Sequence, residues 1–296
     1  MNGESMGSIL ANAAELIKGE GFTGAHSFIF LTRYASLCGD KALMSLIGNS
    51  LSALSTLPES ASLAYAYAEY YQATEADFCP AAVDFLLGRC REDDPMLLPA
   101  TAKCARVFSS EDWFERAILM ARDALSEEIP MKTLPFVALG LIELYRATFN
   151  REYLKRAMDL GDEIRKKFAD SFDPETAYDL ENPGANSAVA LLYDELARLT
   201  QNKGWLDLRK IQNHFISLLA DKYPTRVAFG LCALLGDEFE WKTVICSLPG
   251  MQITKEVRAL LGFYSPLTEV VAVPSEGEEA QYFIMKNGTL KEIKGI

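Results

Sequence analysis

Three side chains near the starts of predicted helices are of types that perform acid–base chemistry. Glu59 and Asp94 are carboxylates, and His26 carries an imidazole that can take up or release a proton near neutral pH. Two carboxylates that flank a pocket at a suitable separation carry out glycoside hydrolysis. We therefore take Glu59, Asp94 and His26 as candidate catalytic residues.

Each of these three residues also has a purely structural interpretation. Glu59 follows Pro58 in a first helical turn, where the helix dipole favours an acid whatever the function. Asp94 precedes Pro95 and is typical of a residue that caps the following helix. A lone histidine is more often a structural residue than a catalyst. The sequence leaves both interpretations open.

A second group of polar and aromatic residues is expected to bind a ligand. Four lie in loops or first turns of predicted helices, namely Asn186, Ser187, Lys132 and Arg226. Tyr67 and Tyr70 lie on a tyrosine-rich helix. Aromatic rings that line a funnel can stack on sugars, although packing is their commoner use. Asn186 and Ser187 have the alternative role of capping their helix.

The elements that must position these residues form an internal repeat. In five segments a helix ends in a short polar turn and a second helix follows, as in IELYRATFNREYLKRAMDLG. Apolar residues recur at helical spacing on both sides of each turn, so each hairpin buries its faces only by stacking on neighbours. We predict twelve helices, near residues 4–18, 25–38, 40–55, 59–73, 76–91, 95–108, 111–127, 132–148, 151–169, 185–200, 204–220 and 225–236.

Twelve helices make six hairpins, the number that closes an (α/α)6 toroid with six inner and six outer helices. We predict an all-α toroid over residues 1–240 and a small α/β appendage over residues 241–296. An open solenoid is the alternative, and the unusually apolar inner helices favour closure. Parallel inner helices place their free N–H groups at one mouth, where the candidate residues are expected to meet.

The C-terminal residues have a different pattern. WKTVICSL and TEVVAVPS predict strands, KEVRALLGFYS predicts a short helix, and QYFIMKNGTLKEIK predicts a hairpin with its turn at Asn287-Gly288. We expect these strands to pack on the toroid. The alternative is that they offer an edge to a partner or a second copy.

Composition excludes several classes of function. The formal net charge is -12, with 29 basic against 41 acidic residues, which argues against nucleic-acid binding. No signal peptide and no apolar stretch long enough to cross a bilayer is visible, so a cytoplasmic protein is expected. The six cysteines form no CxxC pair and are expected to be buried reduced thiols. Two histidines make a His-based metal site improbable, and no cofactor is expected.

Several segments resemble the helical portion of the YyaL/spermatogenesis-associated thioredoxin-like family, among them GFTGAHSFIFLTRYASLCGDKAL, SLAYAYAEYYQAT and NPGANSAVALLYDELARLTQN. That family combines a thioredoxin-like domain with an (α/α)6 toroid similar to six-hairpin glycosidases and N-acylglucosamine 2-epimerases. The resemblance implies the toroid, but the thioredoxin-like domain has no counterpart in these residues. A separate thioredoxin-like protein is therefore an expected partner.

The positions at the mouth depart from the family pattern. His26-Ser27 replaces Pro-Lys, Asp93-Asp94-Pro95 replaces Trp-Asn-Gly, and Lys132-Thr133 replaces Asp-Asp, whereas Asn186-Ser187 and the acid Glu59 are kept. The packing positions persist while most polar mouth positions differ. This favours a non-catalytic or repurposed toroid that binds a small carbohydrate-like ligand. The alternative is a glycoside hydrolase or sugar epimerase that uses the mouth carboxylates.

Overall fold

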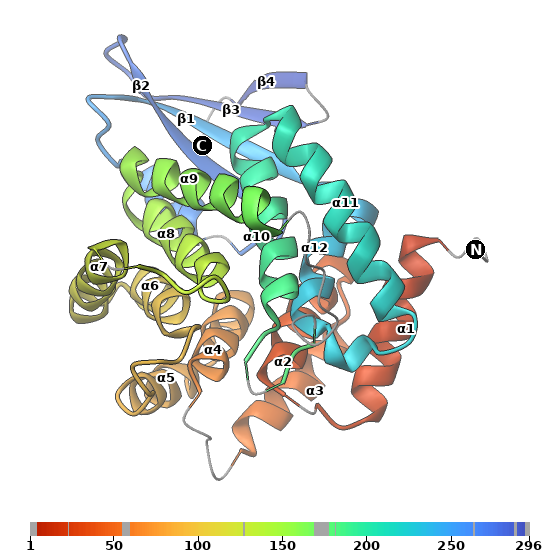
Figure 1. Cartoon of the computed structure of the whole chain (residues 1–296). Coiled ribbons are helices and arrows are strands. Elements are labelled where there is room, and N and C mark those ends of the chain that lie inside the picture. Colours follow the sequence, from red (N-terminus) through yellow and green to blue (C-terminus); the bar gives the residue numbers. More distant parts are fainter. Residues whose placement is uncertain are drawn as a thin grey trace.

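The computed structural model describes residues 5–22, 24–54, 60–126, 128–168, 178–180, 182–262, 264–286 and 289–293. In the described part of the chain, twelve α-helices come first (Figure 1), and the predicted helical chain with a small C-terminal sheet is confirmed. Their bounds are α1 Met6–Gly19, α2 Ala25–Cys38, α3 Lys41–Ser52, α4 Ala61–Thr74, α5 Cys79–Leu87, α6 Leu97–Phe108, α7 Glu111–Ser126, α8 Leu134–Thr148, α9 Arg151–Phe168, α10 Ala185–Thr200, α11 Lys203–Ala220 and α12 Ala228–Glu238.

The even-numbered helices contact one another in a cyclic order. Helix α2 packs against α4, α4 against α6, α6 against α8, α8 against α10, α10 against α12, and α12 against α2. The odd-numbered helices pack on the outside of these pairs (Figure 1). None of the helices in the described part of the chain is long and apolar enough to cross a membrane.

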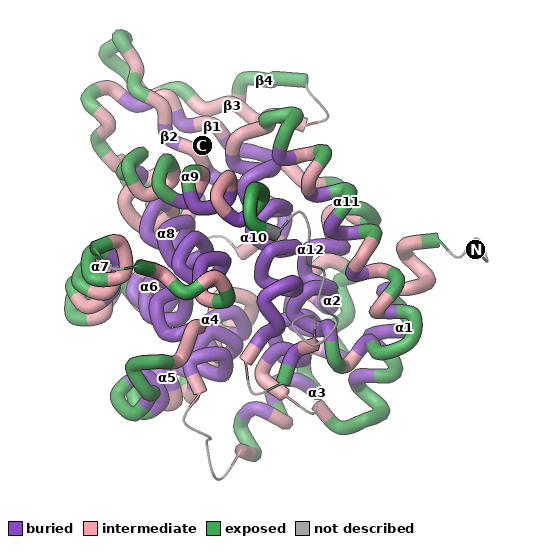
Figure 2. Tube along the Cα trace, viewed as in Figure 1, coloured by how far each residue is buried: buried purple, intermediate pink, exposed green. Residues whose placement is uncertain are grey.

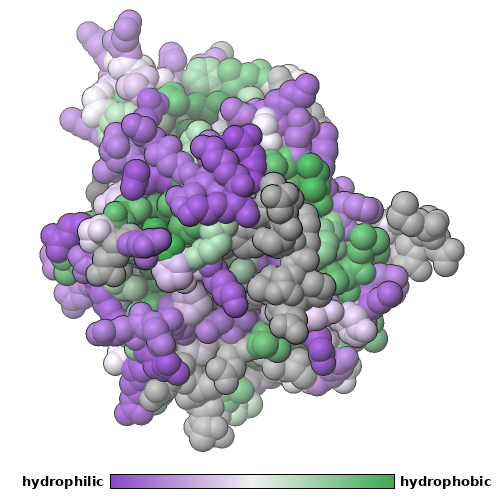
Figure 3. All heavy atoms as spheres, viewed as in Figure 1, coloured by the Kyte–Doolittle hydropathy of each residue, from purple (hydrophilic) through white to green (hydrophobic). Residues whose placement is uncertain are grey.

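Burial follows this division between even and odd helices. Helix α10 is buried along its length from Ala185 to Leu199, whereas α9 buries a narrow stripe that includes Ala157, Leu160 and Ile164 (Figure 2). A helix that is buried all round belongs in a core, and a helix with one apolar stripe covers it. The face shown in Figure 3 carries mainly hydrophilic side chains with smaller apolar patches between them.

A small mixed sheet and a thirteenth helix follow α12. The strands are β1 (Lys242–Pro249), β2 (Thr268–Ser275), β3 (Gln281–Lys286) and β4 (Thr289–Ile293), in the order β2-β1-β3-β4. Strands β1 and β2 are parallel, and α13 (Lys255–Gly262) connects them, because parallel neighbours need a crossover. The predicted turn at Asn287-Gly288 lies outside the described residues. Both β1 and β2 contact α10, which brings this segment against the helices.

Candidate functional site

Five even-numbered helices end with the same backbone geometry. The residue after each helix is left-handed, with φ between 53° and 68°, at Gly39, Glu75, Ser109, Phe149 and Gln201. Such a residue stops a helix because its N–H turns back to a carbonyl of the last turn, as from Glu75 to Tyr71. The five helices therefore have a common reference point from which side chains can be compared.

An ionisable side chain lies six positions before each of these left-handed residues. The five are Arg33, Glu69, Lys103, Glu143 and Glu195, and all of them are buried. Because the helices end alike and are neighbours, their side chains at this position come together at one end of the helix assembly. Helix α12 is different: its C-cap Phe239 is extended, and Ala233 occupies the corresponding position.

These ionisable side chains and their partners form a charged cluster, and one half of it is centred on Glu69. Arg33 donates two hydrogen bonds to its carboxylate, at 3.0 and 3.2 Å, and Lys103 Nζ lies 2.7 Å from Oε2. The Tyr264 hydroxyl donates to Oε1 at 2.7 Å. Burial alone raises the pKa of Glu69, but Arg33 and Lys103 outweigh it and lower this pKa to about 2. Glu69 is thus an anion that two cations share.

The other half of the cluster is centred on Arg146. Its guanidinium contacts Glu143 at 2.8 Å, Glu195 at 3.3 Å and Glu269 of β2 at 2.8 Å. Arg106 donates Nε and Nη2 to Glu143, whose pKa lies far below its usual value, because the two arginines outweigh burial. Burial raises the pKa of Glu195, and its arginine neighbours only partly offset this. Acids in one cluster therefore differ in proton affinity.

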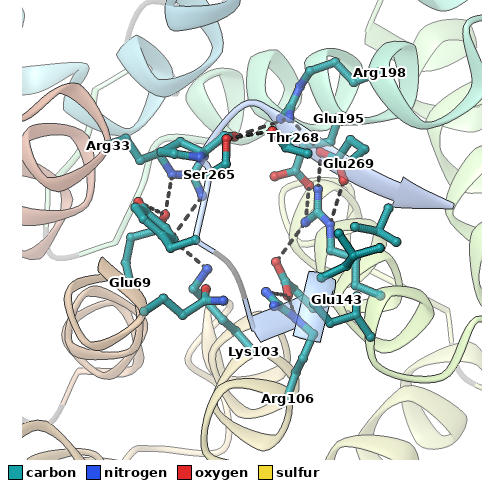
Figure 4. Close-up of a pocket in the computed structure, with 17 residues that line it drawn as sticks. Arg33, Glu69, Lys103, Arg106, Glu143, Glu195, Arg198, Ser265, Thr268 and Glu269 are labelled. Carbon is teal, nitrogen blue, oxygen red and sulfur yellow. Dashed lines mark hydrogen bonds and ion pairs between the residues drawn. The ribbon is translucent and has the colours of Figure 1, made fainter. Parts of the chain in front are cut away.

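The segment between α13 and β2 closes the cluster on one side. Arg198 donates to the Pro266 carbonyl at 3.4 Å and to Glu269 at 2.6 Å. The side chains of the charged cluster and of this segment line a cavity of about 80 Å³ (Figure 4). In Figure 4, Arg33 and Glu69 lie on one side of the opening, and Glu143 and Glu269 lie on the other. Nine of the seventeen residues that line the cavity are charged, and the others include Leu260, Leu261 and Tyr264.

A larger groove of about 730 Å³ adjoins the cavity. The two hollows share Gln72, Arg106 and Leu261. The groove has the aromatic rings of Tyr71 and Phe114 among its lining residues, together with the carboxylates of Glu75 and Glu111. Its volume falls within the range of small-molecule sites, about 300–1,000 Å³, and such sites combine apolar walls with a few polar groups.

Of the three predicted catalytic residues, the structure describes Asp94 and His26. Glu59 lies outside the described residues. Asp94 accepts hydrogen bonds from the N–H groups of Ala61, at 3.1 Å, and Met96, at 2.9 Å, so it joins the starts of α4 and α6. His26 is buried against the edge of Phe229, with 6.2 Å between ring centroids. Burial lowers the pKa of His26 to about 4, so its ring is neutral at pH 7.

The predicted ligand-binding residues are dispersed. Tyr67 and Tyr70 donate their hydroxyls to carbonyls of α3, at Leu51 and Met44, which is the packing role rather than a funnel lining. Asn186 and Ser187 are wholly buried in α10. Lys132 is exposed before α8, and Arg226 is exposed beside the rings of Tyr178 and Tyr223.

Asp179 is a buried acid at the predicted mouth that sequence reasoning missed. It accepts the N–H groups of Phe229, at 2.7 Å, and Gly184, at 2.9 Å, and it contacts the Ser187 side chain. Burial raises its pKa to about 7 against the effect of these hydrogen bonds. Asp179 thereby ties the starts of α10 and α12 together. It lies in a segment without helical periodicity, so no pattern pointed to it.

The charged cluster was also missed, although a signal for it exists in the sequence. Aligning the repeats on their turns places Arg33, Glu69, Lys103, Glu143 and Glu195 in one column of otherwise apolar helices. No protein-family model matches this chain, and no curated protein matches its sequence. The family resemblance therefore stays a prediction.

Proposed function

We propose that this chain is a non-catalytic (α/α)6 toroid that binds a small hydroxyl-rich, carbohydrate-like ligand. The cyclic contacts of the even-numbered helices support six hairpins closed on themselves. We place the ligand in the groove beside the charged cavity, at the C-terminal ends of the inner helices, rather than at the predicted mouth. A relationship to the YyaL/spermatogenesis-associated thioredoxin-like family, and a separate thioredoxin-like partner, remain proposals of the same kind.

The groove is the observation that carries this proposal. Tyr71 and Phe114 offer apolar ring faces, on which the apolar faces of a sugar ring can stack. Gln72 supplies both a donor and an acceptor, and Glu75 and Glu111 supply acceptors. A polyhydroxylated molecule has the matching donors and acceptors around an otherwise apolar ring.

The contacts of Asp94 and His26, the two described residues of the predicted catalytic set, favour a structural role over catalysis. Both carboxylate oxygens of Asp94 accept backbone N–H groups, which leaves this residue a helix-joining role. His26 is enclosed and neutral at pH 7. The enzyme alternative, a glycoside hydrolase or epimerase, relies on Glu59 together with these two residues. A general acid or base must reach the proton that it transfers. His26 is buried, and both oxygens of the half-buried Asp94 already accept hydrogen bonds.

The proposal is tested by a thermal-shift screen over neutral mono- and disaccharides, followed by calorimetry. We expect a saturable rise in melting temperature with at least one sugar, because a ligand that binds only the native state stabilises it. The Phe114→Ala variant should lose this binding. The matched control is Phe85→Ala, since Phe85 is 43% exposed on α5, away from the groove. Sugar binding that Phe114→Ala leaves unchanged would refute the groove as the site.

A further inference from the structure

The side chains around the cavity carry unequal numbers of charges. Five cations line it, at Arg33, Lys103, Arg106, Arg146 and Arg198, but only four carboxylates, at Glu69, Glu143, Glu195 and Glu269. The inequality is local. In one half, Arg106, Arg146 and Arg198 face three carboxylates of the lining, and Arg198 also pairs with the buried Asp194 behind the cavity, at 3.0 Å. In the other half, Arg33 and Lys103 share Glu69 alone.

Lys103 is a buried cation with one ion-pair partner among the described residues. Within the described part of the chain its Nζ forms an ion pair only with Glu69, at 2.7 Å, and it lies 4.6 Å from the centroid of the Tyr65 ring. An ammonium group has three donors, so Lys103 has hydrogen-bonding capacity beyond this one carboxylate. Its side chain is 3% exposed. A buried cation with spare donors is costly unless an anion or a polar group in the cavity compensates it.

Arg106 is a second cation with a spare hydrogen-bond donor, and it lines both the cavity and the groove. It lies one helical turn after Lys103 on α6, so the two side chains share a helix face. Among the described residues, Nε and Nη2 of Arg106 bond to Glu143, and no partner takes its Nη1. Gln72 lines both hollows beside these cations and can donate from its amide. Donors therefore converge where the groove meets the cavity.

The cavity has room for an anionic group. A water molecule needs about 10–15 Å³ of such volume, and the cavity measures about 80 Å³. We propose that the ligand of the groove is an oxyanion, a phosphate ester or carboxylate of a hydroxyl-rich molecule, with its anionic group held by Lys103, Arg106 and Gln72. This inference rests on the proposed function for the body of the ligand. The bound anion supplies the negative charge that the Glu69 half lacks.

Calorimetry with glucose 6-phosphate, gluconate, glucose and inorganic phosphate, at constant ionic strength, tests the inference. We expect glucose 6-phosphate or gluconate to bind at least tenfold more tightly than glucose, an effect between that of a close charge pair in bulk water and that of one near a protein surface. The phosphate and carboxylate arms distinguish the two kinds of oxyanion. Equal affinity for the neutral sugar and the anionic sugars, or no saturable binding of any anionic probe, overturns the inference.

Variants of Gln72 test the location without removing a buried ion pair. Gln72 is half-buried, so its replacement is compatible with folding, which circular dichroism checks. Gln72→Glu should weaken binding of the anionic probe roughly tenfold by placing a like charge beside it, and Gln72→Lys should preserve or tighten binding. Gln281→Glu adds the same charge on the exposed start of β3 and serves as the control. Identical affinities in all three variants overturn the assignment.

The two proposals fail in different ways. If glucose binds as well as its anionic derivatives and Phe114→Ala abolishes this binding, the groove function stands and the oxyanion inference falls. If inorganic phosphate binds and responds to the Gln72 charge series while Phe114→Ala has no effect on any sugar, the anion site stands and the groove function falls.

Discussion

Glu69 is the residue whose protonation has the clearest consequence for stability. Its folded-state pKa is about 2, below the ordinary value of 4.5, because Arg33 and Lys103 outweigh the effect of burial. Between these two pH values the unfolded chain holds more protons than the folded chain. The stabilisation from Glu69 is therefore complete above pH 4.5 and is lost as the pH falls toward 2.

We predict that Glu69→Gln lowers the free energy of unfolding at pH 7 by about 3–5 kcal/mol, since removing one partner leaves two buried cations uncompensated. The difference between wild type and variant should shrink as the pH falls from 4.5 to 2. Urea unfolding at several pH values measures it. Glu15→Gln, at a carboxylate that is 75% exposed and paired with Lys18, is the control and should change stability by less than about 1 kcal/mol. A difference that stays constant over this pH range contradicts the assignment.

The sequence predicted which residues are ionisable but not which of them meet. Arg33 and Glu69 are 36 residues apart, and Arg146 and Glu269 are 123 residues apart, so their pairing exists only after the helices assemble. Likewise, periodicity showed that Tyr67 lies on a helix but not that its hydroxyl reaches the Leu51 carbonyl. The capping role suggested for Asp94 is local only in part: Asp94 accepts the N–H of Met96, the N-cap of α6, but its bond to Ala61 spans 33 residues.

At the scale of elements, four of the five left-handed residues that end even-numbered helices are not glycine and carry backbone strain. Ser109 has φ of 53°, a conformation that costs a residue with a Cβ roughly 1–2 kcal/mol. The side chain of Ser109 is exposed. Glycine adopts the same geometry without this cost, although it gains more freedom in the unfolded chain.

We predict that Ser109→Gly raises the free energy of unfolding by up to about 1 kcal/mol. Thermal and urea unfolding followed by circular dichroism measure the change. Ser109→Ala is the matched variant, because it removes the hydroxyl but keeps the Cβ, and it should give no increase. If alanine stabilises the protein as much as glycine does, backbone strain at this position is not the cause.

The spacing of apolar residues predicted the positions of the helices well, because local sequence determines where a helix forms. Each of the twelve predicted helices has a counterpart, and the strands after residue 240 were predicted from their β-branched residues. The largest error in helix length concerns α5, predicted over 76–91 and found over Cys79–Leu87. Apolar spacing continues beyond both ends of α5, so the pattern alone did not show where the helix stops.

At the scale of the whole molecule, Glu269 is the residue of the C-terminal segment that forms ion pairs with two helices. Arg146 donates to both of its oxygens, at 3.1 and 2.8 Å, and Arg198 donates at 2.6 Å. Glu269 is 3% exposed. Its carboxylate thus joins α8 and α10 to β2, and the sheet depends on this contact for its position.

We predict that Glu269→Gln accelerates amide hydrogen exchange in β1 and β2 by about two orders of magnitude, corresponding to roughly 3 kcal/mol of easier local opening. Protection in α2, α4 and α12 should change much less. Exchange followed by mass spectrometry resolves these regions, and Glu292→Gln on the exposed strand β4 is the control. Uniform acceleration over all helices would falsify this local fastening.

The alternation of buried charges also bears on how similar hairpins find their correct neighbours during folding. Chains built from near-equivalent units can pair in the wrong order, because apolar contacts discriminate poorly between them. Here Arg33, Glu69, Lys103 and Glu143 alternate in sign along four consecutive even-numbered helices. Exchanging α4 with α6 would place Lys103 beside Arg33 and Glu69 beside Glu143, and would bury like charges together. The order of charges thus makes the native order of hairpins more stable than an order in which two of them are exchanged.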